Sequence, residues 1–367
     1  MLDAAYYAAR GLSSIYKKIL NRKRLDFDDG MTLFACPDIT ALGSLAHEVR
    51  TKFHDLKTHY VVNRQINYTN VCVNDCVFCA FRRDNVSEPG AFLLDKTAIL
   101  RRVEEAFQGS PGLDELHIVG GCHPDLPLSF FEDVFEEIGS RWPGLPIKAF
   151  TPVEIAHFAK KESLSPKQVL VRLQKSGLAM LPGGGAEIFD EKLRSVLCPS
   201  KANAAEWLEI SGTAHKLGIK SNCTMLYGHV ENAAQRVDHL LRLRDQQDKT
   251  GGFTCFIPLR FLTSNNRLKL PHGGANALES LKVIAISRLL LDNIEHIKAY
   301  WIMLGQKLAQ TALWYGANDL DGTIVEEHIG HMAGSKTSQG LTINELEEMI
   351  RESGFEPVRR NALFASV

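Results

Sequence analysis

From about residue 60 onward, the sequence alternates between short apolar stretches and amphipathic helical patterns. The short stretches are typical of buried β-strands, and the segments between them repeat with the period of a helix that packs on a core. Strands that alternate with helices indicate a parallel sheet, and eight such units are typical of a (β/α)8 TIM-type barrel. We therefore expect an α/β fold built on one barrel. The candidate strands are residues 61–69, 115–120, 146–151, 178–182, 219–226, 253–261, 296–304 and a short one near Asn318.

The segments between and around these strands are predicted to be helical. The patterns cover residues 96–107, 128–138, 202–217, 233–247 and 278–293, with a short helix at 306–314 and a last one at 343–353. Residues 1–60 also look helical, and Asp38 is a candidate N-cap. No Pro- or Ser-rich linker divides the chain. We expect an N-terminal helical extension over residues 1–60, a barrel over 61–330 and a C-terminal cap over 331–367.

Composition limits the classes of function. A chain of 367 residues with 45% hydrophobic and 23% charged residues is typical of a soluble globular protein. A formal net charge of −1 argues against general binding to nucleic acid or to an anionic membrane. The N-terminus has no apolar run that would predict a signal peptide or a membrane span, so we expect a cytoplasmic protein.

Three of the eight cysteines, Cys72, Cys76 and Cys79, stand together after the first predicted strand. The other five are isolated and are interpreted as small buried side chains. The C-x3-C-x2-C spacing supplies three thiolates, one fewer than the four that normally hold a [4Fe-4S] cluster, so one iron would stay open for chemistry. Three alternatives remain: zinc would need a fourth ligand, a disulfide would leave an odd cysteine, and an electron-transfer cluster would normally have a fourth cysteine.

Two glycine-rich segments follow later strands. Gly120 and Gly121 end the second strand, where adjacent glycines permit close approach of the backbone to a ligand. Residues 181–188 after the fourth strand contain three glycines and then Glu187, but no Lys-Ser or Lys-Thr of a phosphate loop. Glu187 is a candidate acceptor for ribose hydroxyls. The alternatives are two ordinary turns, with Glu187 at the start of a helix.

The cysteine spacing, with the aromatic Phe78 before the last cysteine, resembles the radical S-adenosylmethionine superfamily. This resemblance implies a [4Fe-4S] cluster on Cys72, Cys76 and Cys79, with S-adenosylmethionine chelating the open iron. It also implies that Gly120 and Gly121 contact the amino group of the cofactor. Reductive cleavage of the cofactor would then give a 5′-deoxyadenosyl radical.

A narrower resemblance extends from about residue 33 to residue 363. Residues 63–70, 121–127, 181–188, 224–231 and 250–253 resemble the enzymes of the futalosine pathway to menaquinone. Three sister activities share this pattern: aminofutalosine synthase, dehypoxanthine futalosine cyclase and a deazaflavin cofactor synthase subunit. Residues 297–305 and 318–323 resemble the aminofutalosine synthase family. Gln65 and Cys122 depart from the pattern, which normally has histidine and leucine there.

The resemblance implies addition of the adenosyl radical to 3-[(1-carboxyvinyl)oxy]benzoate, loss of a carboxylate and formation of 6-amino-6-deoxyfutalosine. S-adenosylmethionine would be a co-substrate, and a flavodoxin or ferredoxin would supply the electron. A scaffold stabilised by zinc, or an iron–sulfur electron carrier, is the alternative from another class.

A substrate with two carboxylates needs cationic or strong donor groups at the strand ends. The candidates for substrate binding are His123, His229 and Arg260, and the candidates for catalysis are His123, Tyr227, His229 and Asp319. Each has an ordinary alternative as a turn, helix-start or surface residue, and the same applies to Asp321. His328 and His331 have a metal-like spacing, but residues 325–331 are interpreted as a charged helix face with no metal.

Overall fold

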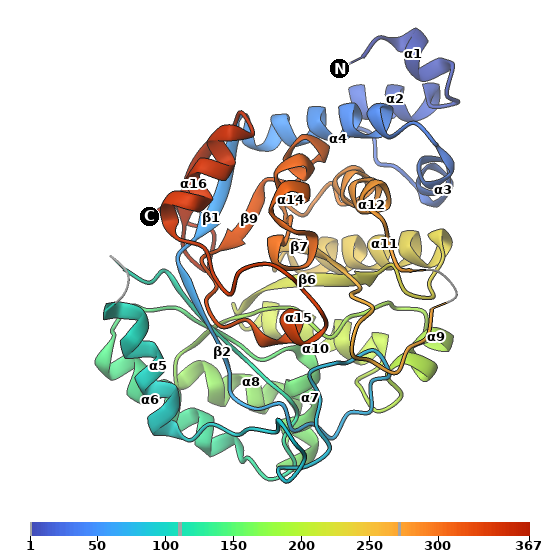
Figure 1. Cartoon of the computed structure of the whole chain (residues 1–367). Helices are drawn as coiled ribbons and strands as arrows, with labels where there is room; N and C mark the ends of the chain where they lie inside the picture. The colour runs from blue at the N-terminus through green and yellow to red at the C-terminus, as the bar shows by residue number, and fades with distance from the viewer. Residues whose placement is uncertain (1, 109–111, 271–272) are drawn as a thin grey trace.

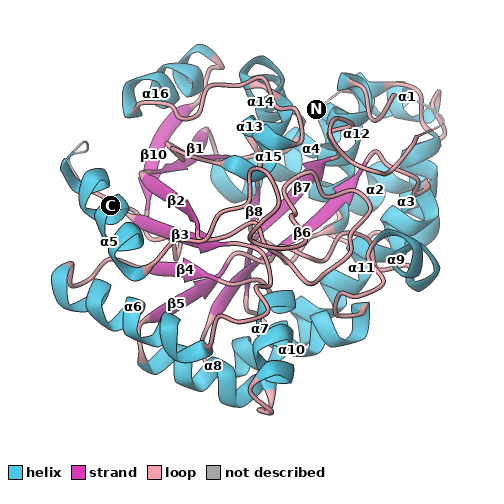
Figure 2. Cartoon of the chain, turned by 60° about the horizontal axis from the view of Figure 1, so that its bottom comes forward, coloured by secondary structure: helices cyan, strands magenta, loops and turns pink. Residues whose placement is uncertain are grey.

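The computed structural model describes residues 2–108, 112–270 and 273–367. Seven parallel strands form one sheet in chain order, as Figure 2 shows. They are β2 (Asn63–Asn67), β3 (Glu115–Val119), β4 (Ile147–Ala149), β5 (Leu178–Leu181), β6 (Lys220–Tyr227), β7 (Phe253–Arg260) and β8 (His296–Ile297).

Three further strands close the barrel at one side. β1 (Lys57–Val61) runs directly into β2 and pairs in parallel with β9 (Asp319–Gly322) and β10 (Glu356–Arg360). A bridge between Lys298 and Asp319 connects the end of β8 to β9. β9 is therefore the eighth strand of the barrel, and the α/β fold expected from the alternating pattern is confirmed.

Helices surround this barrel (Figure 1). The first four precede it: α1 (Ala4–Ala8), α2 (Ser13–Leu20), α3 (Phe27–Ala35) and α4 (Ile39–His54). Those between the barrel strands are α5 (Lys96–Gln108), α6 (Leu128–Arg141), α7 (Pro152–Lys161), α8 (Pro166–Lys175), α9 (Glu191–Leu197), α10 (Ala204–Lys216), α11 (Ala233–Thr250), α12 (Ala277–Leu290), α13 (Trp301–Leu304), α14 (Gln306–Ala312) and the 3₁₀ turn η1 (Leu313–Tyr315). The last two are α15 (His328–Met332) and α16 (Ile343–Glu352).

The N-terminal helices pack on the outer layer of the barrel rather than standing apart. Asp38 caps α4 by accepting a hydrogen bond from the Ala41 N–H at 3.0 Å, as its position predicted. α4 lies against α12 and η1, with a close approach of Gly43 to the Tyr315 ring. At the other end of the chain, β10 pairs in parallel with β1, the strand that follows the N-terminal helices.

One predicted strand is wrong. Residues 296–304 form only the two-residue β8, after which residues 301–304 turn into α13. A short apolar run does not distinguish a buried strand from a buried helical turn, and Gly305 ends this turn with a φ of +81°. The pattern also missed β10 and the helices α7, α8 and α9. None of the described helices is long and apolar enough to cross a membrane.

Candidate active site

The cysteine loop follows the carboxyl end of β2 and is fixed to its neighbours by backbone hydrogen bonds. Cys72 N–H donates to Arg83 O at 3.1 Å, and Arg83 N–H donates to Asn70 O at 2.8 Å. Val73 N–H donates to Cys122 O at 3.0 Å, which ties the loop to the segment after β3. The loop is therefore rigidly placed at the barrel end where active sites of this architecture lie.

The three sulfurs have different surroundings. The Cys122 backbone N–H lies 3.3 Å from Cys72 Sγ and donates to it. A hydrogen bond with the Cys122 thiol lowers the pKa of Cys72 to about 6, whereas burial raises the pKa of Cys76 to about 12. Burial also raises the pKa of Cys79. Because a thiolate is the form that binds a metal, Cys72 is ready for ligation, while Cys76 and Cys79 need a bound cation to ionise.

The three sulfurs are not gathered as closely as the ligands of one zinc ion. Three sulfurs that share one tetrahedral zinc lie about 3.8 Å apart, given Zn–S bonds of about 2.3 Å. Within the described ranges, the groups of three ligand atoms that approach one another to 4.8 Å do not include Cys72, Cys76 and Cys79. A polynuclear cluster, in which each thiolate binds a different iron, does not require the three sulfurs to lie that close together.

Gly120 and Gly121 bring the end of β3 against the cysteine loop. A Cβ on Gly121 would lie 2.3 Å from Val71 O and 3.0 Å from Cys72 Cβ. A Cβ on Gly120 would lie 2.8 Å from the Tyr68 ring. Both positions therefore require glycine for packing of the protein itself, in addition to any role in binding a cofactor.

Glu154 is a buried carboxylate that sequence analysis missed. It lies in the first turn of α7, and it accepts hydrogen bonds from Tyr68 Oη at 2.9 Å and from Gly120 N–H at 3.2 Å. It also accepts from Thr151 N–H at 2.7 Å in a capping box. Burial raises the pKa of Glu154 to about 7 despite these donors. The Thr-x-x-Glu spacing after the third strand was the signal that could have identified it.

The glycine-rich turn after β5 places Glu187 in the site. Glu187 has a φ of +50°, and its Oε1 lies 2.6 Å from Lys201 Nζ. Gly183 has a φ of +75°, and a Cβ there would lie 2.0 Å from Asn222 O on β6. The turn is therefore shaped by close packing on the neighbouring strand, and it presents Glu187 beside the cysteine loop.

Lys201 is the second residue that sequence analysis missed. Its ammonium lies 5.2 Å from the centroid of the Phe78 ring, so it contacts the cysteine loop directly. Burial alone would lower the pKa of Lys201, but the charges of Cys76 and Glu187 raise it well above its ordinary value. Lys201 thus adds a positive charge next to the thiolates. No local sequence signal distinguishes it from a surface lysine.

The structure brings His123 close to the cysteine loop. His123 follows Cys122, and its Nδ1 accepts from Asp125 N–H at 3.1 Å. The neutral ring therefore carries its proton on Nε2, which is buried and has no partner among the described residues. An N–H donor left unpaired in this position is available to a bound acceptor.

His229 lies further along the same end of the barrel. Its Nε2 donates to Leu226 O at 3.0 Å, and its Nδ1 lies 3.0 Å from Glu231 Oε2. Glu231 also accepts from Arg236 Nε at 2.7 Å. Burial lowers the pKa of His229, and the charge of Glu231 opposes this effect.

Tyr227 and Arg260 are register partners on β6 and β7. The Tyr227 ring packs toward the helical layer, 5.9 Å from the Arg236 guanidinium on α11. Its hydroxyl and the Arg260 Nε are buried without a hydrogen-bond partner in the described part of the chain. The contacts of Tyr227 direct it away from the cysteine loop.

Asp319 does not follow the eighth strand, as the sequence suggested, but begins it. Its Oδ2 accepts from Arg360 Nε at 2.6 Å, and Lys298 Nζ lies 3.6 Å from its Oδ1. Asp321, in the same strand, lies 3.0 Å from Lys298 Nζ. These charges are buried and pair with one another, so Asp319 belongs to a buried ion-pair network at the base of the barrel.

The same network extends across the barrel interior. Lys148 on β4 pairs with Glu115 on β3, and Glu115 also lies 3.3 Å from Asn63 Nδ2. Two register positions further along β2 and β3, Gln65 pairs with His117. This part of the barrel interior is therefore polar. In most barrels of this architecture the interior is filled with branched apolar side chains.

Comparisons with known proteins identify the family of this chain. The radical SAM superfamily matches residues 66–243, and the CofH/MqnC C-terminal region matches residues 250–366. The aminodeoxyfutalosine synthase of Thermus thermophilus is 44% identical over 97% of this chain and 96% of its own length. That of Streptomyces coelicolor is 41% identical over 95% of this chain and 92% of its own length. The 5-amino-6-(D-ribitylamino)uracil–L-tyrosine 4-hydroxyphenyl transferase of Archaeoglobus fulgidus is 40% identical over 87% of this chain and 92% of its own length.

Solved structures share the fold at low identity. Methylornithine synthase superimposes with a TM-score of 0.75 at 18% identity, covering 94% of this chain and 97% of its own. The FeFe-hydrogenase maturase HydG of Carboxydothermus hydrogenoformans superimposes with a TM-score of 0.73 at 17% identity. The match covers 98% of this chain and 82% of the HydG chain. From the sequence relatives and the three-cysteine loop together, the chain belongs to the radical SAM superfamily, in the family that contains the aminodeoxyfutalosine synthases.

Proposed function

We propose that this chain is an aminodeoxyfutalosine synthase. It joins the adenosyl group of S-adenosylmethionine to 3-[(1-carboxyvinyl)oxy]benzoate, with loss of a carboxylate, to give 6-amino-6-deoxyfutalosine. The observation that carries the proposal is the 44% identity to a synthase over nearly the whole of both chains. The three-cysteine loop at the carboxyl end of a parallel barrel supports it, because this is where a radical enzyme of this architecture assembles its cofactor.

Cys72, Cys76 and Cys79 hold the [4Fe-4S] cluster in this proposal. The cluster and S-adenosylmethionine, when bound, supply the 5′-deoxyadenosyl radical. The chain contributes the surroundings: Cys122 N–H donates to the Cys72 sulfur at 3.3 Å, and Lys201 adds a positive charge near Cys76. Both favour negative charge on the ligating sulfurs.

Glu187 accepts hydrogen bonds from the ribose hydroxyls of S-adenosylmethionine. Lys201 holds its carboxylate in place through the 2.6 Å contact. Gly120 and Gly121 leave room for the amino acid part of the cofactor, and Phe78 provides an apolar wall. The turn that carries Glu187 is closely packed, because Gly183 lies against β6 and Gly185 lies against Val153 of α7.

The substrate carboxylates need donors, and His123 is the first we assign. Its Nε2–H is buried and unpaired within the described residues, so it gains a hydrogen bond when a carboxylate binds. His229 and Arg260 are further candidates at the same end of the barrel. Asp319 pairs with Arg360 and Lys298 at the base of the barrel, so we do not assign it a catalytic role.

A reduced flavodoxin or ferredoxin is the electron donor in this proposal. The sulfur-bearing loop lines a cavity of about 370 Å³ that includes Cys76, Cys79 and Arg267. Arg267 is itself exposed and pairs with Asp75. An electron donor that docks over this cavity approaches two of the three ligands.

The decisive experiment is a product analysis. Anaerobically reconstituted enzyme is mixed with reductant, S-adenosylmethionine and 3-[(1-carboxyvinyl)oxy]benzoate, and products are identified by mass spectrometry. We expect an adduct that contains the adenosyl group, with a Cys76→Ala variant as the inactive control. Release of 5′-deoxyadenosine without an adduct contradicts the proposal.

The second candidate is the transferase activity named for the Archaeoglobus relative, which is nearly as similar at 40% identity. The same reconstituted enzyme is incubated with 5-amino-6-(D-ribitylamino)uracil and tyrosine. Turnover of this pair, and not of the carboxyvinyl ether, would favour the transferase. The dehypoxanthine futalosine cyclase predicts a third outcome, in which neither pair is turned over.

A further inference from the structure

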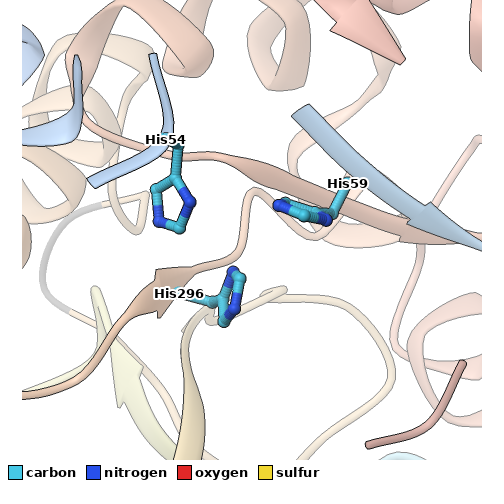
Figure 3. Close-up of side chains that lie close together, drawn as sticks. All are labelled: His54, His59 and His296. Carbon is cyan, nitrogen blue, oxygen red and sulfur yellow. The ribbon is translucent and has the colours of Figure 1, made fainter. Parts of the chain in front are cut away.

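Three histidines meet at the end of the barrel opposite the cysteine loop. His54 ends α4, His59 lies in β1 and His296 begins β8. Figure 3 shows their rings around a common space, and one ligand nitrogen of each lies within 4.8 Å of the others. Ring centroids are 4.9 to 5.7 Å apart. We call these residues the histidine trio. The amino-terminal ends of the strands hold it, so it is separate from the candidate active site.

The rings of the trio are uncharged at neutral pH. Burial lowers the pKa of His54 to about 3 and also lowers the pKa of His59 and His296. The Arg288 charge adds to the effect at His54. A metal ion binds only the neutral imidazole, so no proton has to be released before binding.

A hydrogen bond assigns the lone pair of the His54 ring. His54 Nε2 lies 2.8 Å from Glu295 O, and because a carbonyl only accepts, Nε2 donates and Nδ1 keeps its lone pair. A backbone carbonyl on the outer nitrogen is the usual support of a metal-binding histidine. His59 Nδ1 is buried without a hydrogen-bond partner among the described residues.

His296 is held from its other side. Its Nδ1 lies 2.8 Å from Asn318 Nδ2, and Asn318 Oδ1 accepts from Ile297 N–H at 2.9 Å and from Arg288 at 2.6 Å. The amide is thereby oriented with its NH2 toward His296, whose Nδ1 accepts. A metal on this nitrogen replaces one hydrogen bond. The ring also stacks on Phe364 at 4.2 Å, so the C-terminal segment covers the trio.

Two features set the expected strength of binding. Zn–N bonds of about 2.1 Å place tetrahedral nitrogens about 3.4 Å apart, so the rings must approach one another by about 1.4 Å or less. Arg50, Arg288 and Arg360 repel a dication, while Asp319 attracts it. The charge of Asp319 raises the pKa of both His59 and His296, and that of Arg360 lowers it. The affinity is therefore expected to be lower than that of a four-ligand structural zinc site.

We propose that His54, His59 and His296 bind one divalent transition-metal ion, with Zn²⁺ as the best match for three imidazoles and a water. The ion would join the N-terminal helices, β1 and β8, beneath the C-terminal segment. Its role is structural, and it does not depend on the proposed activity.

The test begins with the reconstituted full-length enzyme. It is incubated with Zn²⁺ and desalted, and zinc per chain, the melting temperature and zinc X-ray absorption are measured. We expect about one zinc per chain, nitrogen or oxygen neighbours at about 2.0–2.1 Å, and a melting temperature raised by about 2–5 °C. Sulfur neighbours at about 2.3 Å would place the zinc on cysteines and overturn the proposal.

Matched variants locate the site. His59→Gln and His296→Gln should lose both the zinc and the thermal shift, and both should keep the synthase activity. His47→Gln is the control, because His47 lies in the same helix as His54 but packs on Trp314 outside the trio. Zinc retained by His59→Gln would overturn the proposal. If a variant does not fold, the zinc X-ray absorption spectrum of the wild-type enzyme still distinguishes histidine ligands from cysteine ligands.

Discussion

Lys201 Nζ and Glu187 Oε1 form a buried ion pair at 2.6 Å, directly beside the Phe78 ring of the cysteine loop. The pair joins the turn after β5 to the loop after β2. It explains how an isolated carboxylate can be held at the edge of a cluster-binding loop, since Lys201 neutralises it and fixes its direction.

Replacing Lys201 tests this relationship. Lys201→Met leaves Glu187 buried without its cation, which we expect to cost about 3–5 kcal/mol of stability. We also expect the KM for S-adenosylmethionine to rise at least about tenfold. Iron content after reconstitution should stay near that of the wild type. Steady-state kinetics and iron analysis measure both effects.

Two controls separate position from stability. Lys192→Met removes an exposed lysine from α9 and should change neither the stability nor the KM for S-adenosylmethionine. The double variant Lys201→Met with Glu187→Gln removes both charges and should recover much of the stability, but not the affinity for the cofactor. Normal cofactor affinity in the double variant would show that the pair is only structural.

Gly121→Ala should disrupt the cysteine loop. Its Cβ would lie 2.3 Å from Val71 O, a backbone atom that cannot rotate away, so the loop must shift. We expect a loss of about 1–3 kcal/mol and an iron content below half of the wild-type value. Gly139→Ala in α6 is the control, because nothing lies within 4 Å of its new Cβ. That change should stabilise the enzyme by about 0.5–1 kcal/mol. Full iron loading of Gly121→Ala would contradict the packing argument.

Asp319→Asn should act on stability rather than on chemistry. The change leaves Arg360 buried without its partner, at a cost of about 3–5 kcal/mol in the free energy of unfolding. Denaturant unfolding measures this loss, and kcat of the folded fraction should be nearly unchanged. A large fall in kcat at unchanged stability would instead support the catalytic role that the sequence suggested.

Glu154 predicts a pH dependence. Its pKa is about 7 in the folded protein and about 4.5 in the unfolded chain, so the folded state binds this proton more tightly. Its contribution to stability is complete below pH 4.5 and is lost as the pH rises through 7, by up to about 3 kcal/mol. Glu154→Gln should flatten the stability profile between pH 5 and 7 relative to the wild type. An unchanged slope in thermal unfolding across this range would contradict the prediction.

Much of the barrel was predictable because its signals are local. Strand and helix periodicity needs only neighbouring residues, and so does the N-cap at Asp38. The cysteine spacing and the glycine pair also lie in short segments. These segments predicted that the cysteine loop lies beside the glycine pair at the end of the second predicted strand. The backbone hydrogen bond from Val73 N–H to Cys122 O joins the loop to the segment that carries this pair.

The errors occurred where local pattern and tertiary context disagree. The apolar residues 296–304 fit a strand, but a strand of that length would leave no room for α13, and Gly305 ends the helical turn. Asp319 looked like a residue after a strand, because a four-residue strand with two carboxylates has no apolar signal. Lys298 and Arg360 make those buried charges acceptable, and neither is a neighbour of Asp319 in the sequence.

The remaining features required the folded chain. Lys201 becomes a candidate site residue only because the turn after α9 lies against the cysteine loop. The histidine trio forms only where α4, β1 and β8 meet. Spacing along the chain reports ligands that share one loop, as Cys72, Cys76 and Cys79 do. It carries no information on pairs that are distant in sequence, because burial and charge neutralisation decide which of those come together.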